Sequence, residues 1–206
     1  MKSISRREFL LGSAAIAGVS VISGNASTVI LTPRASEGPF YPKPPMRFPD
    51  IDNDLIKIAG MVKQAGGEII LLKGRMMNRD GQPLAGHRIE IWQCDVNGRY
   101  LHPRDRRNIP YDTGFQGFGH DITDNNGRYS FRTIKPAKYP GRAPHIHVKV
   151  SDGKRELLNT QFYIAGHSDN DGDFLFRRMS VKQAKTVSMV FHQSNDILET
   201  SIDVVV

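Results

Sequence analysis

The sequence predicts an all-β fold, a β-sandwich of mostly antiparallel strands with little helix. Short segments rich in β-branched and aromatic residues alternate with Gly, Asn and Pro turn signals, which is typical of strands in such folds. The composition, 206 residues with 19 Gly and 12 Pro, suits one turn-rich domain, and its 39% hydrophobic residues suffice for a core. We therefore expect two packed sheets in a single domain.

The expected elements follow from these patterns in chain order. A proline-rich arm over residues 28–54 should be extended, and residues 79–84 (Arg-Asp-Gly-Gln-Pro-Leu) form a strong turn. The Asn-Asn-Gly turn at residues 125–127 predicts a hairpin between its flanking strands. One short helix is expected near residues 181–185. The expected strands span residues 68–77, 87–93, 120–124, 127–134, 143–151, 157–164, 187–192 and 197–206.

The N-terminus is similar to a twin-arginine export signal. Arg6 and Arg7 precede a weakly apolar stretch over residues 10–22, which is too short for a confident transmembrane helix. We expect cleavage after Ala26, export to the periplasm and a mature domain over residues 27–206. An ordinary secretory signal or an uncleaved anchor is the alternative. Residues 1–26 carry a net charge of +2, so their removal lowers the formal charge from +7 to +5.

Net charge and cysteine content argue against several kinds of function and of metal site. A positive net charge favours an anionic substrate, but the chain has no long basic run and no basic-aromatic repeat, so nucleic-acid binding is not expected. Cys94 is the only cysteine, which excludes an intrachain disulfide and a multi-cysteine metal site. Any metal must therefore be bound by nitrogen and oxygen.

His145 and His147 are candidates for such ligands. If Ile146 lies in a strand, the two histidines point to the same face with Cα atoms roughly 6.6 Å apart, so both rings can reach one ion. Each of them alone would more often be an ordinary strand histidine. Tyr139 and Arg142 stand within six residues of the pair. This stretch predicts half of a metal site, and the remaining ligands must come from elsewhere.

Several ordered motifs between about residues 32 and 166 together resemble the intradiol ring-cleavage dioxygenases, and most closely their protocatechuate 3,4-dioxygenase branch. The motifs are Gly-Pro-Phe-Tyr-Pro at 38–42, Ile-Glu-Ile-Trp-Gln-Cys-Asp at 89–95, Gly-Arg-Tyr at 98–100, Thr-Asp at 123–124, Gly-Arg-Tyr-Ser-Phe-Arg-Thr-Ile-Lys-Pro at 127–136, Tyr-Pro at 139–140, Arg142 with His-Ile-His at 145–147, and Thr-Gln at 160–161.

The resemblance implies a non-haem ferric site. By position, Tyr100 and Tyr139 match the family's two tyrosinate ligands, and His145 and His147 match its two histidines. Phenolates are hard anionic donors that favour Fe(III), whereas zinc more usually collects Cys, His or carboxylate. Tyr139 is expected to leave the metal when substrate binds.

The resemblance also assigns roles around the metal. Arg142 matches an arginine expected to stabilise negative charge on the substrate; by itself it would be read as a surface charge. The expected substrate-binding residues are Gly38, Pro39, Tyr41, Trp92 and Gln161. For Trp92 and Gln161 the alternatives are a core position and a strand end.

The implied reaction is intradiol cleavage of a catechol-like or protocatechuate-like aromatic by O2, giving a cis,cis-muconate-type diacid. The expected partners are this small substrate and O2, within a homo-oligomer. Only five residues separate Tyr139 from His145, where well-known relatives carry a longer insertion, so this pocket wall must differ. Two alternatives remain: a non-catalytic transthyretin-like or carboxypeptidase-regulatory-like binding module, and a divalent-metal hydrolase that uses the histidine pair.

Other features favour ordinary explanations. The acidic run at 169–173 imitates the start of an EF-hand loop but has Ser180 at the twelfth position, so a polar surface loop is expected. The segment at 104–107 is expected to be a solvated loop. The remaining histidines match no ligand motif, namely His87, His102, His120, His167 and His192.

Overall fold

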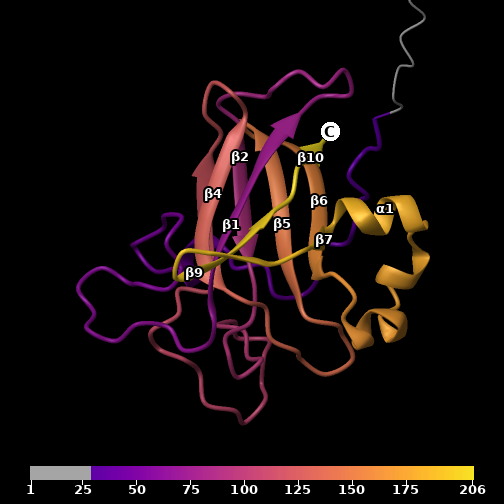
Figure 1. The fold of residues 1–206 in the computed structure, drawn as a ribbon. Helices are drawn as coiled ribbons and strands as arrows, with labels where there is room; N and C mark the ends of the chain where they lie inside the picture. The colour runs from indigo at the N-terminus through magenta and orange to yellow at the C-terminus, as the bar shows by residue number, and fades with distance from the viewer. Residues whose placement is uncertain (1–28) are drawn as a thin grey trace, which may run out of the picture.

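A computed structural model describes residues 29–206, which form two five-stranded sheets packed face to face (Figure 1). In the first sheet, β1 pairs with antiparallel β4 and, along its other edge, with parallel β9 and β10, while β8 pairs with β9. The strands of this sheet are β1 Ile69–Met77, β4 Arg128–Ile134, β8 His192–Ser194, β9 Ile197–Ser201 and β10 Val204–Val205.

The second sheet has the order β3-β2-β5-β6-β7 and is antiparallel except for the β6–β7 pair. Its strands are β2 Arg88–Trp92, β3 Phe118–Ile122, β5 His145–Asp152, β6 Arg155–Ile164 and β7 Ser188–Met189. The predicted β-sandwich is therefore confirmed, with most strand pairs antiparallel.

Helix is limited, as the sequence predicts. The helix α1 (Val181–Thr186) begins at Ser180, whose hydroxyl accepts from the Gln183 amide while the Gln183 side chain accepts from the Ser180 amide. This capping box explains why so short a helix forms there. Three 3-10 turns complete the helical content of the described residues: η1 (Pro44–Met46), η2 (Ser168–Gly172) and η3 (Phe176–Arg178). No helix in this part of the chain has the length and apolarity needed to cross a membrane.

The hairpin predicted around the Asn-Asn-Gly turn is wrong. The turn itself forms, with Gly127 at φ 71° and its amide bonded to the Asp124 carbonyl. However, β3 pairs with β2 and β4 pairs with β1, so the turn carries the chain from one sheet to the other. A short turn between two strands brings them close but does not fix their pairing partner, and here β3 forms five residue pairs with β2 while β4 forms seven with β1.

The last two predicted strands are each divided. The predicted strand at 187–192 becomes β7 in one sheet and β8 in the other, and the strand at 197–206 becomes β9 and β10. Between β9 and β10, the Asp203 carboxylate accepts the Arg75 amide of β1 and interrupts the ladder. The predicted turn after β1 is confirmed, with the Asn78 side chain accepting the amides of Asp80 and Gln82.

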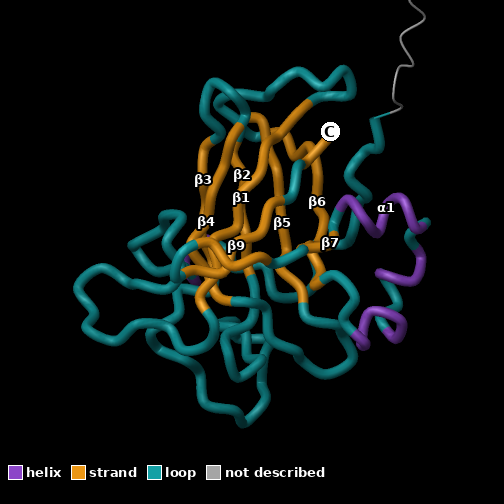
Figure 2. The backbone as a smooth tube through the Cα atoms, viewed as in Figure 1, coloured by secondary structure: helices purple, strands orange, loops and turns teal. Residues whose placement is uncertain are grey.

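The core lies between the sheets and includes side chains from only one face of β5. Ile146, Val148 and Val150 point into the main apolar cluster, so His145 and His147 point away from it, to the outer face of the second sheet. Loops gather at one end of the sandwich, below the sheets in Figure 2. The arm and these loops cover that outer face, as the contacts below show.

Candidate metal centre

The two histidines of β5 meet at a single point. Nε2 of His145 lies 3.2 Å from Nε2 of His147, and both residues are about 1% exposed. The Nδ1 of His145 donates to the Ala143 carbonyl at 2.6 Å, which leaves its Nε2 lone pair free. With metal–nitrogen bonds of about 2.1 Å, two ligands at a right angle lie about 3.0 Å apart. The pair therefore has the spacing of adjacent ligands to one ion.

Tyr100 reaches this point from the loop after β2. Its ring centroid lies 6.2 Å from that of His147, and its hydroxyl is buried with no hydrogen-bond partner. The residue is held by the buried Asp105 carboxylate, which accepts the Tyr100 amide at 2.8 Å. A buried hydroxyl without a partner carries a desolvation cost, which binding to a metal ion would remove.

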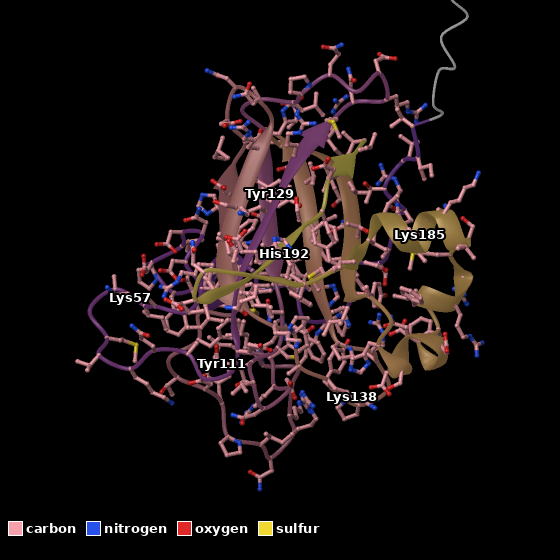
Figure 3. All side chains as sticks on the ribbon, viewed as in Figure 1. Lys57, Tyr111, Tyr129, Lys138, Lys185 and His192 are labelled. Atoms are coloured by element: carbon pink, nitrogen blue, oxygen red, sulfur yellow. The ribbon has the colours of Figure 1, made fainter. Side chains whose placement is uncertain are left out.

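Tyr139 completes the group from the loop before β5. Its ring centroid lies 5.4 Å from Tyr100 and 5.5 Å from His145. Gly98 allows the two tyrosine loops to approach, because it has φ +73° and a Cβ there would lie 2.3 Å from the Lys138 carbonyl oxygen. In Figure 3, Lys138 and Tyr111 mark this loop end of the molecule. The structure thus brings together all four predicted metal ligands.

Burial changes the acidity of all four side chains. Desolvation raises the pKa of Tyr100 well above its usual value and also raises that of Tyr139, on which the neighbouring Arg142 acts in the opposite direction. Burial, with a smaller contribution from Arg142, lowers the pKa of His145 to about 4, and burial also lowers that of His147. Without metal the site therefore holds neutral phenols and neutral imidazoles. Neutral imidazoles are the form that ligates, and the phenols need a cation to ionise.

The N-terminal arm of the same chain covers the site. Phe40 stacks on Tyr100, with centroids 4.5 Å apart and planes 21° apart, and its edge meets Tyr139 at 6.2 Å. Gly38, at φ +77°, lies so close that a Cβ would be 3.2 Å from Cε1 of His147. The arm is anchored beyond the roof, where the Tyr41 hydroxyl donates to the buried Glu90 at 2.7 Å.

The predicted substrate-binding residues take different positions. Gly38, Pro39 and Tyr41 lie on the roofing arm, with Pro39 exposed. Trp92 and Gln161 are about 1% exposed and flank His147 from β2 and β6. The Trp92 ring stacks on His147 with centroids 4.7 Å apart, and the Gln161 amide nitrogen lies 3.4 Å from His147 Nδ1. Both side chains support an expected ligand from behind.

Arg142 is held deep beside the tyrosines. Its Nε donates to Asp173 at 2.8 Å, its Nη2 donates to Gln161 at 2.6 Å and to Tyr163 at 3.1 Å, and its Nη1 lies 3.4 Å from the Tyr139 hydroxyl. The side chain is 10% exposed. It lies where a fixed positive charge can act on the site.

Three residues near the site were not found from the sequence. Asp173 belongs to the segment expected to be a polar surface loop, but it is 1% exposed and binds Arg142, so that expectation is wrong at this position. The loop expected to be solvated contains buried Asp105, which holds Tyr100 and Arg107. Phe40 stood in a noted motif but gave no signal that it contacts a ligand. The contacts of Asp173 with Arg142 and of Phe40 with Tyr100 cross between segments far apart in the chain, and the Asp105 contact depends on the fold of its own loop, so sequence spacing cannot show them.

The larger hollows of the described residues differ in their distance from the site. One of about 370 Å³ adjoins Tyr100 and is lined by η1 and the loop after β2, including Met46, Leu101 and Tyr111. A hollow of about 750 Å³ lies on the other sheet, near Arg75 and Arg128, and contains none of the four ligands. Over residues 29–206, no group of three or more His, Cys, Asp or Glu side chains could hold a metal. In the described part of the chain, the centre therefore depends on its tyrosines.

Comparisons with known proteins identify the family of the chain. Residues 36–206 match a family model described as "Dioxygenase". The chain belongs to the intradiol ring-cleavage dioxygenase family. The alternative of a non-catalytic transthyretin-like or carboxypeptidase-regulatory-like binding module is therefore not supported.

Two similar proteins of this intradiol family are longer than this chain. Over 124 residues it is 39% identical to the protocatechuate 3,4-dioxygenase beta chain of Burkholderia cepacia, covering 56% of this chain and 53% of that one. Over 201 residues it is 28% identical to a catechol 1,2-dioxygenase of Acinetobacter baylyi, covering 82% and 57%. The chain spans a little more than half of the length of each of these relatives.

A solved structure of similar size is that of the dioxygenase domain of a dioxygenase carbohydrate-binding protein fusion from Streptomyces sp. SirexAA-E. It is 30% identical, has a TM-score of 0.64, and the match covers 86% of this chain and 98% of that domain. A catechol 1,2-dioxygenase structure from Acinetobacter sp. ADP1 matches at 25% identity and a TM-score of 0.60, over 84% of this chain and 62% of that one.

Proposed function

We propose that the protein is a non-haem Fe(III) dioxygenase that cleaves a catechol-like or protocatechuate-like aromatic between its two hydroxyl-bearing carbons with O2, to a cis,cis-muconate-type diacid. The observation that carries the proposal is the packing of two phenol rings against two imidazoles whose Nε2 atoms lie 3.2 Å apart, with the Tyr100 hydroxyl buried and without a hydrogen-bond partner. Family membership supports the same chemistry.

The donor set fits ferric iron. Tyr100, Tyr139, His145 and His147 would hold it through two phenolate oxygens and two imidazole nitrogens, and bound Fe(III) would supply the Lewis acidity that keeps the phenols ionised and makes the catechol reactive toward O2. The four candidate ligands include no Cys and no carboxylate, which zinc sites more usually contain beside histidine.

The chain's own residues divide the work of proton handling and orientation. Tyr100 is 3% exposed, whereas Tyr139 is partly exposed, so Tyr139 is the phenol that substrate can displace. As Tyr139 leaves, its oxygen can take a proton from a substrate hydroxyl. Arg142 Nη1, 3.4 Å from that oxygen, can stabilise negative charge there or on the substrate ring. Phe40 and the arm limit the access of water.

Iron loading tests the proposal directly. Protein loaded with ferric iron should absorb visible light through tyrosinate-to-iron charge transfer, and a chelator should remove the colour. Tyr139→Phe should shift this absorption and lower O2 uptake with catechol or protocatechuate by roughly 100-fold or more, since a ligand and proton acceptor is lost. Tyr111→Phe is the matched control, because its hydroxyl donates to the Phe115 carbonyl instead. A colourless ferric-loaded wild-type protein, or extradiol products, would refute the proposal.

Export and assembly are proposed on separate grounds. The expected twin-arginine signal lies outside the described residues, and export to the periplasm rests on Arg6, Arg7 and the apolar stretch that follows. Replacing both arginines with lysine should retain the full-length protein in the cytoplasm, as cell fractionation would show. Periplasmic protein from this double variant would argue against this route. A homo-oligomer is also proposed; the only support is that a similar protein is named as one chain of an enzyme, the protocatechuate 3,4-dioxygenase beta chain.

A further inference from the structure

A buried carboxylate outside the metal-binding group anchors Arg142. Asp173 lies in the loop after β6, between η2 and η3, and its side chain has no exposed surface. It accepts from Nε of Arg142 at 2.8 Å and from Nη2 at 3.4 Å. Burial by itself raises the pKa of this carboxyl, but the hydrogen bonds from Arg142 and from backbone amides lower the pKa overall. The carboxylate is therefore charged and paired where water does not reach it.

The three side-chain nitrogens of Arg142 differ in the acceptors that they contact. Nε is engaged by Asp173, and Nη2 by Gln161 and Tyr163, with the Tyr163 hydroxyl itself donating to Gln161 at 2.7 Å. Nη1 has one contact, the Tyr139 hydroxyl at 3.4 Å, which is long for a hydrogen bond. A guanidinium has five donors in a rigid plane, so fixing Nε and Nη2 also fixes the direction of Nη1.

We propose that Asp173 is a positioning residue that orients Arg142. In this orientation Nη1 points at the Tyr139 oxygen and remains available to stabilise negative charge that develops in the site. The proposal rests on the proposed function for its catalytic consequence. Asp173 itself does not reach the metal-binding group and acts through Arg142. Without the carboxylate, Nε loses its acceptor and the plane can turn about the remaining Gln161 and Tyr163 contacts.

A merely structural role must be separated from this one. Asp173 also accepts the amides of Ala143, Leu175 and Phe176, so it ties its loop to the segment before β5. Loss of these hydrogen bonds would lower the stability of the protein even if the position of Arg142 did not change. A positioning role, in contrast, predicts that the catalytic effect of changing Asp173 disappears once Arg142 is gone.

A double-mutant cycle on ferric-loaded protein makes this separation. Asp173→Asn should lower kcat roughly 10- to 100-fold with KM for catechol changed less than about threefold, because Arg142 acts on developing charge. In the Arg142→Ala background, the same change should cost less than about threefold. Asp169→Asn is the matched control in the same loop, since Asp169 pairs with the exposed Lys138 at 2.8 Å; it should leave kcat unchanged. Equal losses in both backgrounds would overturn the proposal.

A second measurement does not depend on activity. In metal-free protein, the Arg142 Nε–H should give a slowly exchanging 15N NMR signal, which is identified by its loss in Arg142→Lys. Asp173→Asn should speed its exchange by at least about tenfold, whereas Asp169→Asn should not. Unchanged exchange in Asp173→Asn would overturn the proposal. If the exchange result is as expected but wild-type ferric protein is inactive, the positioning stands and the proposed function fails.

A folding defect would not leave the question open. If Asp173→Asn does not fold, Asp173→Glu keeps the charge but shifts the carboxylate by one methylene, and the same cycle and exchange measurement apply to it. Partial loss of kcat that vanishes without Arg142 supports the proposal, and a loss that persists without Arg142 refutes it.

Discussion

At the scale of single residues, the site uses ordinary side chains whose behaviour is changed by burial. His145 and His147 would be weak bases on an exposed strand, but here they are neutral because desolvation opposes their charged forms. The same burial leaves the Tyr100 hydroxyl without a partner. The four candidate ligands are therefore uncharged until a cation binds, and the metal-free protein should respond to acid in a defined way.

Metal-free protein should lose stability as pH falls from about 6.5 to about 4. The pKa of His145 is about 4 in the folded state and about 6.5 when unfolded, so the unfolded chain binds more protons in this window and acid favours it. The difference corresponds to about 3 kcal/mol for this residue, and the lowered pKa of His147 acts in the same direction.

Urea unfolding at pH 7 and pH 4.5 measures this loss. His145→Gln should reduce the pH dependence, because the buried imidazole that resists protonation is removed. The same pH dependence in His145→Gln as in the wild type would contradict the assignment.

At the scale of elements, the N-terminal arm decides how the site is enclosed. It runs beside the sandwich through backbone bonds of Thr32 with Val205 and of Ala35 with Asn159. Ion pairing of Glu37 with Lys149 at 2.7 Å continues this attachment. The arm has almost no regular structure of its own, so its position depends on a few backbone and side-chain contacts with the two sheets.

Tyr41→Phe should loosen the arm. The Tyr41 hydroxyl donates to buried Glu90 and accepts from Arg47 at 2.9 Å, so its removal should cost about 1–3 kcal/mol of unfolding free energy. Hydrogen exchange measured by mass spectrometry should rise in peptides over residues 32–47 and stay constant in β5, the internal control. Unchanged exchange in the arm would show that other contacts hold it.

At the scale of the whole molecule, the sandwich provides one covered outer face. The core between the sheets is filled by aliphatic and aromatic residues, and the four candidate metal ligands lie outside it. Tyr100 belongs to a second cluster with Trp92 and Cys94, and Tyr139 packs against that cluster. The arm that roofs this group comes from the same chain, through Phe40 on Tyr100 and Gly38 against His147. The chain therefore supplies the cover of its own candidate site.

Activity per subunit should consequently be independent of assembly. If the protein is a homo-oligomer, dilution to concentrations where sedimentation shows monomers should change kcat by less than about twofold, since the roof is not borrowed from a partner. Phe40→Ala, which removes the roofing ring, should lower activity to the same extent at every dilution. Loss of wild-type activity in step with dissociation would contradict this prediction.

The sequence by itself determined the β-rich fold, most strand positions and the four metal-binding candidates. These follow from local chemistry: a strand period of two places His145 and His147 on one face, turn residues mark the strand ends, and the ordered motifs identify the family. The residues that Tyr100 and Arg142 depend on, Asp105 and Asp173, could not be found this way.

Only the tertiary structure decided which strands pair, which loops meet and which polar face is buried. The pairing of β3 with β2 rather than β4 is a competition between ladders that no turn encodes. The face of β5 that carries His145 and His147 would be exposed in a bare sandwich. It is covered because the arm and the loops carrying Tyr100 and Tyr139 fold across it, and burial by distant segments is a property of the whole chain rather than of any local pattern.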